Sequence, residues 1–328
     1  MADAEDLKSS GDFSSCGFDS HPGHQLFSHF ETYAVIAPQN SMRRLFATPS
    51  RLKLLVILIL PLTIPGRAPA QQPASSAGAF LGFDLNTYPG DAAIPVLRKT
   101  FSFAGYWLSP PLGARQNTWL GKRHLLISQK FGFLLLYQGP QSNELKSITP
   151  AASRGAADAS RAAANAKKEG FPPQAIIFLD IEEGGRLPET YHAYLRAWVD
   201  RLTRAGYRAG VYCSGMPASE GHGVTIITAD DIRHHLAGRE VTYFVYNDAC
   251  PPAPGCVISR HPPAPSASGV PYAAVWQFAQ SPRRKEFTAR CAATYNADGN
   301  CYVPADSKLS WFLDLDASTT SDPSAGRN

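Results

Sequence analysis

The chain has 328 residues, a net charge of +4 and 44% hydrophobic residues, enough for a sizeable core in one large domain or two modest ones. No long Lys/Arg cluster is interleaved with aromatic residues, which argues against a nucleic-acid-binding function. The sequence also lacks a G-x-G-x-x-G motif and a phosphate-binding loop, so we expect no nucleotide and no other cofactor.

Residues 42–70 have the pattern of an export signal. A basic segment precedes an apolar run over residues 54–64, and an A-x-A-like exit at 68–70 predicts a mature chain that begins at Gln71. The apolar run is too short for a bilayer-spanning helix, so we expect no membrane span after cleavage. Arg43 and Arg44 fit part of a twin-arginine signal, and both the Sec and the Tat route stay open. A secreted or periplasmic protein is expected.

The segments that flank the expected domain are polar. Residues 1–41 show no periodicity, and we interpret them as a non-native or disordered leader upstream of a start at Met42. The alternative is an unusually long basic region of the signal. Residues 71–78 are expected to form a short linker, and residues 319–328 a disordered tail.

Four of the six cysteines lie in Pro-, Gly- or Asn-rich segments, and they form two pairs that are close in sequence. Export and proximity favour the disulfides Cys250–Cys256 and Cys291–Cys301, although four cysteines allow three pairings. Neither pair has C-x-x-C spacing, so a zinc site made by these cysteines is not expected. Cys213 lies in an apolar run and is interpreted as a buried thiol.

Eight short apolar runs recur through the expected mature chain, and each is rich in β-branched or aromatic residues. They cover residues 79–86, 101–106, 132–138, 175–182, 208–214, 242–247, 273–278 and 311–316. Several are almost continuously hydrophobic, which is typical of parallel strands covered on both faces. Helical patterns fall between many of them, at residues 119–130, 151–169, 188–205 and 230–237. This alternation favours βαβ units and a parallel sheet.

The predicted fold is therefore an α/β, (β/α)8 TIM-like barrel over residues 79–318. The connections at 250–272 and 279–308 carry little helix signal, so we expect a degenerate barrel with one or two helices missing. A doubly wound open sheet is the alternative.

Carboxylates follow several of the predicted strands, at the end of a barrel where active sites lie. Asp180 and Glu182 are two residues apart. On a strand, residues with this spacing point to the same face, so both carboxyl groups would face one cavity. Two like charges there raise at least one pKa, which suits a general acid. Asp84 and Asp314 end the first and last runs and would converge on the same mouth. A plain structural role, such as a helix cap or a loop ion pair, is the competing interpretation.

Aromatic and amide residues at the strand ends are candidates for substrate binding. They are Tyr137, Gln138, Tyr212, Asn247, Trp276 and Gln277, with Asp316 on the last strand. Any single aromatic residue could equally fill the core, whereas a polar amide on an apolar strand needs a partner. Four histidines, at positions 192, 222, 234 and 235, show no metal spacing that also meets the carboxylates. We interpret them as helix or loop surface and expect no metal site.

The order and spacing of five segments resemble a family of secreted glycoside-hydrolase-like barrels of unknown function, related to the family 25 lysozymes, which are N-acetylmuramidases. The segments are Gly82-Phe83-Asp84, Asp180-Ile181-Glu182, Val211-Tyr212-Cys213-Ser214, Trp276-Gln277-Phe278 and Leu313-Asp314-Leu315-Asp316. The resemblance implies that Glu182 is a general acid assisted by Asp180. The family 25 pattern closes its last strand with Asp-Leu-Asn, so which of Asp314 and Asp316 faces the site stays open.

Three functions are compatible with these features. The first is a glycosidase that acts on peptidoglycan or another cell-envelope glycan. The second is a non-catalytic barrel that binds such a glycan, and the third is an envelope-associated barrel that has lost its site. The sequence sets neither the glycan nor the oligomeric state.

Overall fold

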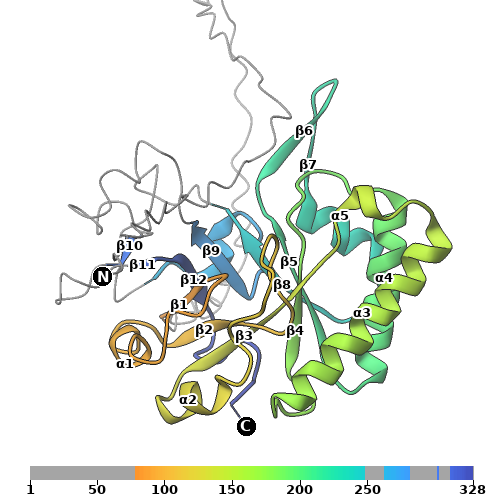
Figure 1. Cartoon of the computed structure of the whole chain (residues 1–328). Helices are drawn as coiled ribbons and strands as arrows, with labels where there is room; N and C mark the ends of the chain where they lie inside the picture. The colour runs from red at the N-terminus through yellow and green to blue at the C-terminus, as the bar shows by residue number, and fades with distance from the viewer. Residues whose placement is uncertain (1–77, 248–261, 281–300, 303–310, 328) are drawn as a thin grey trace, which may run out of the picture. The chain divides into compact units, whose positions relative to one another are not determined.

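A closed barrel of eight strands forms the centre of the computed structural model, which describes residues 78–247, 262–280, 301–302 and 311–327 (Figure 1). The order around the barrel is β1-β12-β9-β8-β5-β4-β3-β2. The strands are β1 (Phe80–Asp84), β2 (Phe103–Trp107), β3 (Gly132–Gln138), β4 (Ile176–Asp180), β5 (Arg208–Ser214), β8 (Val241–Tyr246), β9 (Val275–Ala279) and β12 (Asp314–Ser318). The predicted barrel is confirmed. The open sheet is excluded because β1 pairs with β2 on one side and with β12 on the other, which closes the ring.

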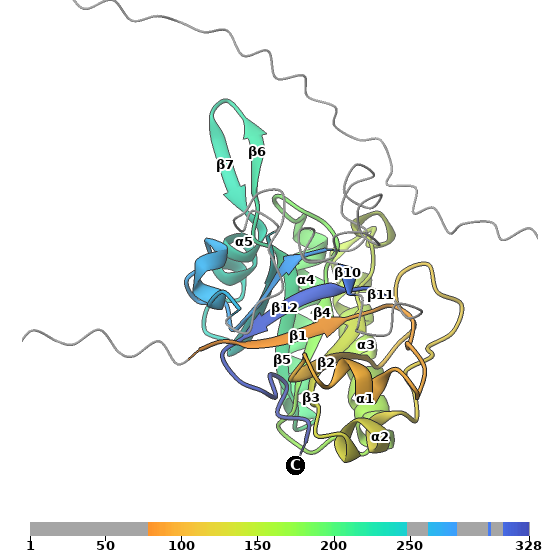
Figure 2. The same ribbon diagram turned by 90° about the vertical axis from the view of Figure 1, so that its left-hand side faces the viewer.

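The last strand runs against the other seven, which corrects the expectation of a wholly parallel sheet. β12 is antiparallel to both of its neighbours, β1 and β9, while the other pairs in the ring are parallel. Figure 2 shows β12 beside β1. An antiparallel neighbour needs no crossover helix, which fits the weak helix signal between β9 and β12. The predicted last strand also splits, into β11 (Trp311–Phe312) and β12.

Helices cover the barrel unevenly (Figure 1). They are α1 (Ile94–Leu97), α2 (Arg123–Ser128), α3 (Ile148–Lys168), α4 (Glu189–Arg204) and α5 (Thr228–His235). Two 3-10 turns, η1 (Ser142–Glu144) and η2 (Pro265–Ser268), add to them. In the Pro-rich connection only residues 262–272 are described, and η2 is the helical element among them. The helices α3 and α4 approach closely because Gly155 has no side chain: a Cβ there would lie 2.2 Å from the carbonyl oxygen of Tyr194.

Two short antiparallel pairs were not predicted. β6 (Pro217–Gly221) and β7 (Val224–Ile227) form a hairpin that projects from the barrel between β5 and α5 (Figures 1 and 2). Its residues are mostly exposed, so the hydrophobic periodicity that reveals a buried strand is absent from it. β10 (Cys301–Tyr302) pairs with β11.

Aromatic rings fill the barrel interior opposite glycines. A Cβ at Gly82 would lie 2.2 Å from the ring of Phe103, and one at Gly210 would lie 2.4 Å from the ring of Phe178. Alternating small and large residues let the inner layers fit within a narrow barrel. These layers lie beneath the strand ends that carry the candidate acids.

The C-terminal segment, residues 319–327, is fastened to the barrel, so the expectation of a disordered tail is wrong. The backbone N–H groups of Leu135 and Ile176 donate to Oγ and to the carbonyl oxygen of Ser324, at 2.8 and 2.9 Å. The N–H of Phe133 donates to Oδ1 of Asp322 at 2.8 Å. The tail is polar in composition, but its oxygens accept hydrogen bonds from N–H groups of β3 and β4 that would otherwise be buried without partners.

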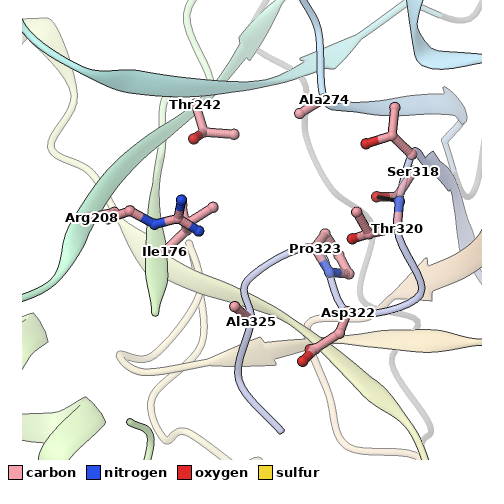
Figure 3. A pocket seen from close by; sticks show the side chains of 10 residues that line it. Ile176, Arg208, Thr242, Ala274, Ser318, Thr320, Asp322, Pro323 and Ala325 are labelled. Atoms are coloured by element: carbon pink, nitrogen blue, oxygen red, sulfur yellow. Dashed lines mark hydrogen bonds between the residues drawn. The ribbon is translucent and has the colours of Figure 1, made fainter. Parts of the chain in front are cut away.

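A cavity of about 370 Å³ lies beside this segment, at the barrel end opposite the acids (Figure 3). Arg208 and Thr242, near the starts of β5 and β8, line one side, and Asp322 and Pro323 line the other. The chemistry predicted from the sequence lies at the other end of these strands. We therefore assign this cavity no part in it.

Replacing Ser324 with alanine should lower the free energy of unfolding by about 1–3 kcal/mol, because the buried N–H of Leu135 loses its acceptor. Urea unfolding at neutral pH would measure the change. Ser128→Ala is the matched control, since the exposed hydroxyl of Ser128 only donates back to Leu125 within its own helix. An equal effect in both variants would contradict the proposed role of the tail.

Several predictions concern residues outside the described part of the chain. They are the leader 1–41, the signal 42–70, most of the linker 71–78, and Cys250, Cys256 and Cys291. Cys301 lies in β10, where only the backbone is described. Cys213 is buried with a free thiol, as expected. None of the helices in the described ranges combines the length and apolar character needed to cross a membrane.

Candidate functional site

Four of the predicted acids meet at one mouth of the barrel. Asp84 and Asp180 are the last residues of β1 and β4, and Glu182 follows two residues after Asp180. Asp314 is the first residue of β12 rather than a residue near its end, and it pairs in register with Asp84. The antiparallel direction of β12 therefore brings Asp314 to the same mouth, for a reason that the sequence did not indicate.

Both acids of the last strand face the barrel interior. Asp316 lies two residues further along β12 than Asp314, in register with Gly82 and Gln277, and is fully buried. No N–H or O–H donor from the described part of the chain reaches its carboxyl oxygens. Burial, followed by the charges of Asp84 and Asp314, raises its pKa well above the ordinary range. A protonated Asp316 can then donate its own hydrogen bond to Asp84, which accounts for the lack of other donors.

Asp84 is almost completely buried, and its carboxyl has a hydrogen-bond donor within the protein. Nε2 of Gln277 donates to its Oδ2 at 2.9 Å. Burial is the largest influence and raises the pKa of Asp84 from 3.8 to about 6, against the opposing effect of the Gln277 hydrogen bond. Gly105 of β2 leaves the space for this side chain, since a Cβ there would lie 2.4 Å from Cβ of Asp84. Sequence reasoning missed Gly105, whose role becomes visible only from the neighbouring strand.

Gln277 links three strands through its amide. The hydroxyl of Tyr212 on β5 donates to Oε1 at 2.7 Å, and Nε2 donates to Asp84 and, at 3.5 Å, to Asp314. These contacts supply the partners that a polar amide on an apolar strand requires. Tyr212 and Gln277, predicted as substrate-binding residues, therefore contact the acid cluster and orient its carboxyl groups.

Asp180 and Glu182 are joined by a side-chain hydrogen bond. Asp180 is buried, and desolvation followed by the charges of Glu182, Asp84 and Asp314 raises its pKa well above the ordinary range. Glu182 is exposed to solvent at the mouth, yet desolvation of its carboxyl also raises its pKa, opposed by the hydrogen bond to Asp180. Of this pair, Glu182 is the one a bulky ligand could reach.

The cluster lacks cationic neighbours. Among the described residues, no Lys, Arg or His forms an ion pair with Asp84, Asp180, Glu182 or Asp316. Carboxyls crowded in this way keep protons to higher pH than isolated ones. Raised pKa values in a group of converging acids are a property of proton-donating sites.

Two of the predicted binding residues point away from the mouth. Tyr137 packs its ring 5.3 Å from that of Trp198 on α4. Trp276 precedes Gln277, so the strand turns its ring to the opposite face, where Nε1 donates to the carbonyl oxygen of Asn247 at 2.8 Å. Both aromatic side chains are buried in the core. Their prediction as residues that stack on a sugar is wrong. Each comes one position before an inward-facing amide, so its side chain points to the outer face of the strand.

The other two predicted amides hold loops near the strand ends. Oε1 of Gln138 accepts the N–H of Leu112 at 2.6 Å, and Gln138 is in register with Asp180. Nδ2 of Asn247 donates to the carbonyl oxygen of Ser268 in η2 at 2.7 Å. Both side chains thus support the surroundings of the site.

His192 was expected on a helix surface, and this expectation is wrong. Its side chain is 1% exposed, and its Nε2 lies 2.9 Å from Oδ2 of the equally buried Asp231 on α5. The two residues are far apart in sequence, so no spacing pattern indicated the contact. The cluster around His192 is separate from the acid cluster and is considered below.

Comparison with protein families gives one match. Residues 124–243 match the family model of the Rv2525c-like, glycoside hydrolase-like domain. This confirms the resemblance predicted from the sequence: over these residues the chain is similar to a glycoside hydrolase-like domain. The match includes Asp180-Ile181-Glu182 and the Tyr212 segment but ends before Gln277 and Asp314. A search of curated proteins found no match.

Solved structures with a similar arrangement include the Tat-secreted protein Rv2525c of Mycobacterium tuberculosis, at 16% identity and a TM-score of 0.44, covering 76% of this chain and 98% of that one. A bacterial lysozyme from Streptomyces coelicolor has 11% identity and a TM-score of 0.44, with 77% and 99% covered. A family 25 glycosyl hydrolase from Bacillus anthracis has 10% identity and a TM-score of 0.41, with 78% and 95% covered.

Proposed function

We propose that the protein is a glycoside hydrolase that acts on peptidoglycan or another cell-envelope glycan, with Glu182 as the general acid and Asp180 assisting it. The observation that carries the proposal is the convergence of raised-pKa carboxyls on one mouth, with Glu182 exposed and Asp180 hydrogen-bonded behind it. Most glycoside hydrolases work with two carboxyl groups at the scissile bond. The family match to a glycoside hydrolase-like domain supports the same reaction class.

In the proposed reaction, the carboxyl of Glu182 gives its proton to the glycosidic oxygen as the bond from that oxygen to the anomeric carbon breaks. Asp180, kept protonated by burial, donates to one carboxyl oxygen of Glu182 and leaves the other directed to the glycan. Positive charge that develops on the sugar is stabilised by the negative potential of Asp84 and Asp314 or by the N-acetyl group of the substrate. Water then adds to the anomeric carbon, and the proton that it loses replaces the one that Glu182 gave to the leaving oxygen.

The proposed substrate fits the compartment that the N-terminal sequence indicates. A signal-like segment at residues 42–70 would direct the chain out of the cytoplasm, to the periplasm or beyond, where envelope glycans are found. Export by the Sec or the Tat route is part of the proposal. The positive net charge of +4 is compatible with an anionic wall as a binding surface.

A non-catalytic glycan-binding barrel is the second candidate. It is favoured by the same mouth but weakened by the positions of Tyr137 and Trp276, since sugar-binding surfaces commonly use exposed aromatic rings and both of these are buried. Incubation of the purified full chain with peptidoglycan and with other envelope glycans, followed by measurement of new reducing ends, separates the two functions. Binding without release of reducing ends would reject the hydrolase and support the binding protein.

A further inference from the structure

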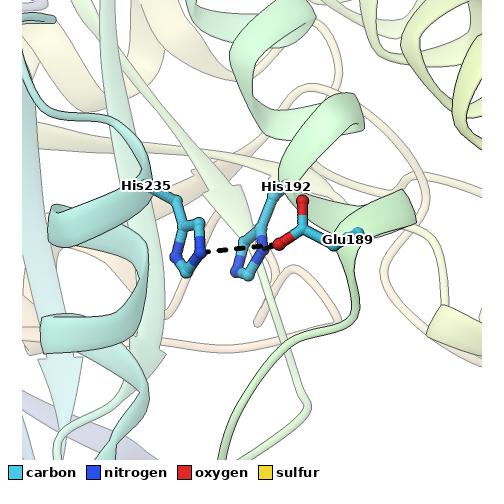
Figure 4. Close-up of side chains that lie close together, drawn as sticks. All are labelled: Glu189, His192 and His235. Carbon is cyan, nitrogen blue, oxygen red and sulfur yellow. Dashed lines mark ion pairs between the residues drawn. The ribbon is translucent and has the colours of Figure 1, made fainter.

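Outside the barrel, three side chains from two helices gather in a group with metal-ligating chemistry (Figure 4). Glu189 and His192 are three residues apart in the first turn of α4, so they share one face of that helix. His235 is the last residue of α5. One ligand atom of each residue lies within 4.8 Å of the others. This group contains none of the acids of the barrel mouth.

The distances suit a small divalent cation. Oε1 of Glu189 lies 3.5 Å from Nδ1 of His192 and 3.6 Å from Nε2 of His235. A tetrahedral zinc ion with bonds of about 2.0–2.1 Å separates its ligand atoms by about 3.3 Å. The two distances from the Glu189 oxygen are close to this spacing, and the two nitrogens lie within 4.8 Å of each other. Water would take the fourth corner of the tetrahedron.

Each histidine is held at its other nitrogen. Nε2 of His192 is 2.9 Å from Oδ2 of Asp231, and Nδ1 of His235 is 2.9 Å from the carbonyl oxygen of the same residue. Zinc-binding histidines are oriented in this way, by a carboxylate or a backbone carbonyl that accepts the second ring N–H. Both contacts leave the second ring nitrogen of each histidine on the side of Glu189.

The buried nitrogen of this group has no hydrogen-bond partner among the residues that the structure describes. Nδ1 of His192 makes no hydrogen bond, although the side chain is 1% exposed. When Asp231 accepts the Nε2 proton, the lone pair on Nδ1 faces the carboxylate of Glu189, an arrangement that is repulsive unless a positive charge lies between them. Glu189 and Asp231 bring two carboxyl groups to the histidines, and the nearest cation paired with them is the guanidinium of Arg186, 3.9 Å from Oδ1 of Asp231.

We propose that Glu189, His192 and His235 bind a zinc ion, or a divalent cation of the same class, with Asp231 orienting both histidines. The rings of the two histidines are stacked at 3.5 Å. An ion lies in the plane of each imidazole that binds it, so the partly exposed ring of His235 must tilt out of this stack about its Nδ1 contact with Asp231, while His192 stays buried. The absence of a metal site expected from the sequence is revised accordingly: the ligands come from two helices that the fold brings together.

The proposed zinc site lies beside the loop that carries Glu182. Oδ2 of Asp231 also accepts the N–H of Leu187 at 3.0 Å, and Thr228 of α5 donates to the carbonyl oxygen of Gly185 at 3.0 Å. These two hydrogen bonds join α5 to the loop between β4 and α4, and this loop carries Glu182. A bound ion would link α4 to α5 beside this loop.

The test is zinc binding by the full chain, purified without a polyhistidine tag, stripped with a chelator and titrated calorimetrically with zinc chloride. We expect one zinc ion per chain and a rise in the thermal unfolding midpoint with zinc. His235→Ala and Glu189→Gln should each weaken binding tenfold or more. Both residues have exposed surface, and circular dichroism without zinc would establish that the variants fold.

His234→Ala is the matched control, because His234 is the exposed neighbour of His235 on the same helix and is not one of the three proposed ligands. It should bind zinc within about twofold of the unmodified chain. Failure of the unmodified chain to bind zinc would overturn the proposal. Binding that is equally strong in His235→Ala and Glu189→Gln would also overturn it, because the ion would then be held elsewhere.

Discussion

The Glu182→Gln variant should lose glycan cleavage by a factor of 10² to 10⁴ while still binding the glycan, because general-acid catalysis typically contributes that much. Glutamine keeps the size and hydrogen-bonding shape of the side chain but has no proton to give to the leaving oxygen. Release of reducing ends from the substrate identified by the assay above measures cleavage, and sedimentation with insoluble wall material measures binding.

Glu183→Gln is the matched control for this variant. Its carboxylate accepts hydrogen bonds from the N–H and the hydroxyl of Ser142, so it faces η1 rather than the mouth. Cleavage should therefore survive in Glu183→Gln. An equal loss in the two variants would show that the loop, and not the acid at position 182, determines the rate.

The pH dependence offers a second measurement on the same residue. The raised pKa of Glu182 keeps its carboxyl protonated to higher pH than that of an isolated glutamate. Activity of the unmodified enzyme should fall as pH rises through that pKa, as the proton to be donated is lost. Residual activity of Glu182→Gln should lack this fall.

The strands were predictable from sequence because their residues are buried. The ranges of β3 and β5, residues 132–138 and 208–214, agree with the structure, since continuous apolar runs report burial directly. The direction of β12 was not predictable, because a short run has the same composition whichever way the strand runs. The exposed β6–β7 hairpin carries no hydrophobic pattern, and its existence depends on local pairing alone.

Part of the candidate site was predictable from sequence, namely the acids that end buried strands. Asp84 and Asp180 follow apolar runs, and that position suffices to place them at a barrel mouth. Residue parity was available for Tyr137 and Trp276 as well, since each precedes an amide assigned to the interior, so only one of each pair can face inward. The histidine cluster could not be found in this way, because His192 and His235 come together only through the packing of α4 against α5.

The Asp84→Asn variant should be more stable than the unmodified protein above pH 6, by roughly 3 kcal/mol, and equally stable near pH 4. The folded protein holds the Asp84 proton up to a pKa of about 6, whereas the unfolded chain releases it near the ordinary value of 3.8. Between these values the native state binds more protons, so its stability falls as pH rises, and asparagine removes the fall. Its Oδ1 can still accept from Gln277.

Urea unfolding at several pH values from 4 to 8 would measure the difference between the two proteins. Asp91→Asn is the control, because this exposed aspartate pairs with Lys122 at 2.8 Å and its pKa is lowered, chiefly by that hydrogen bond. It should show no gain in stability as pH rises. A stability difference for Asp84→Asn that did not change between pH 4 and pH 7 would mean that Asp84 ionises as an ordinary surface carboxylate. Burial would then not raise the pKa of Asp84 as its environment in the structure indicates.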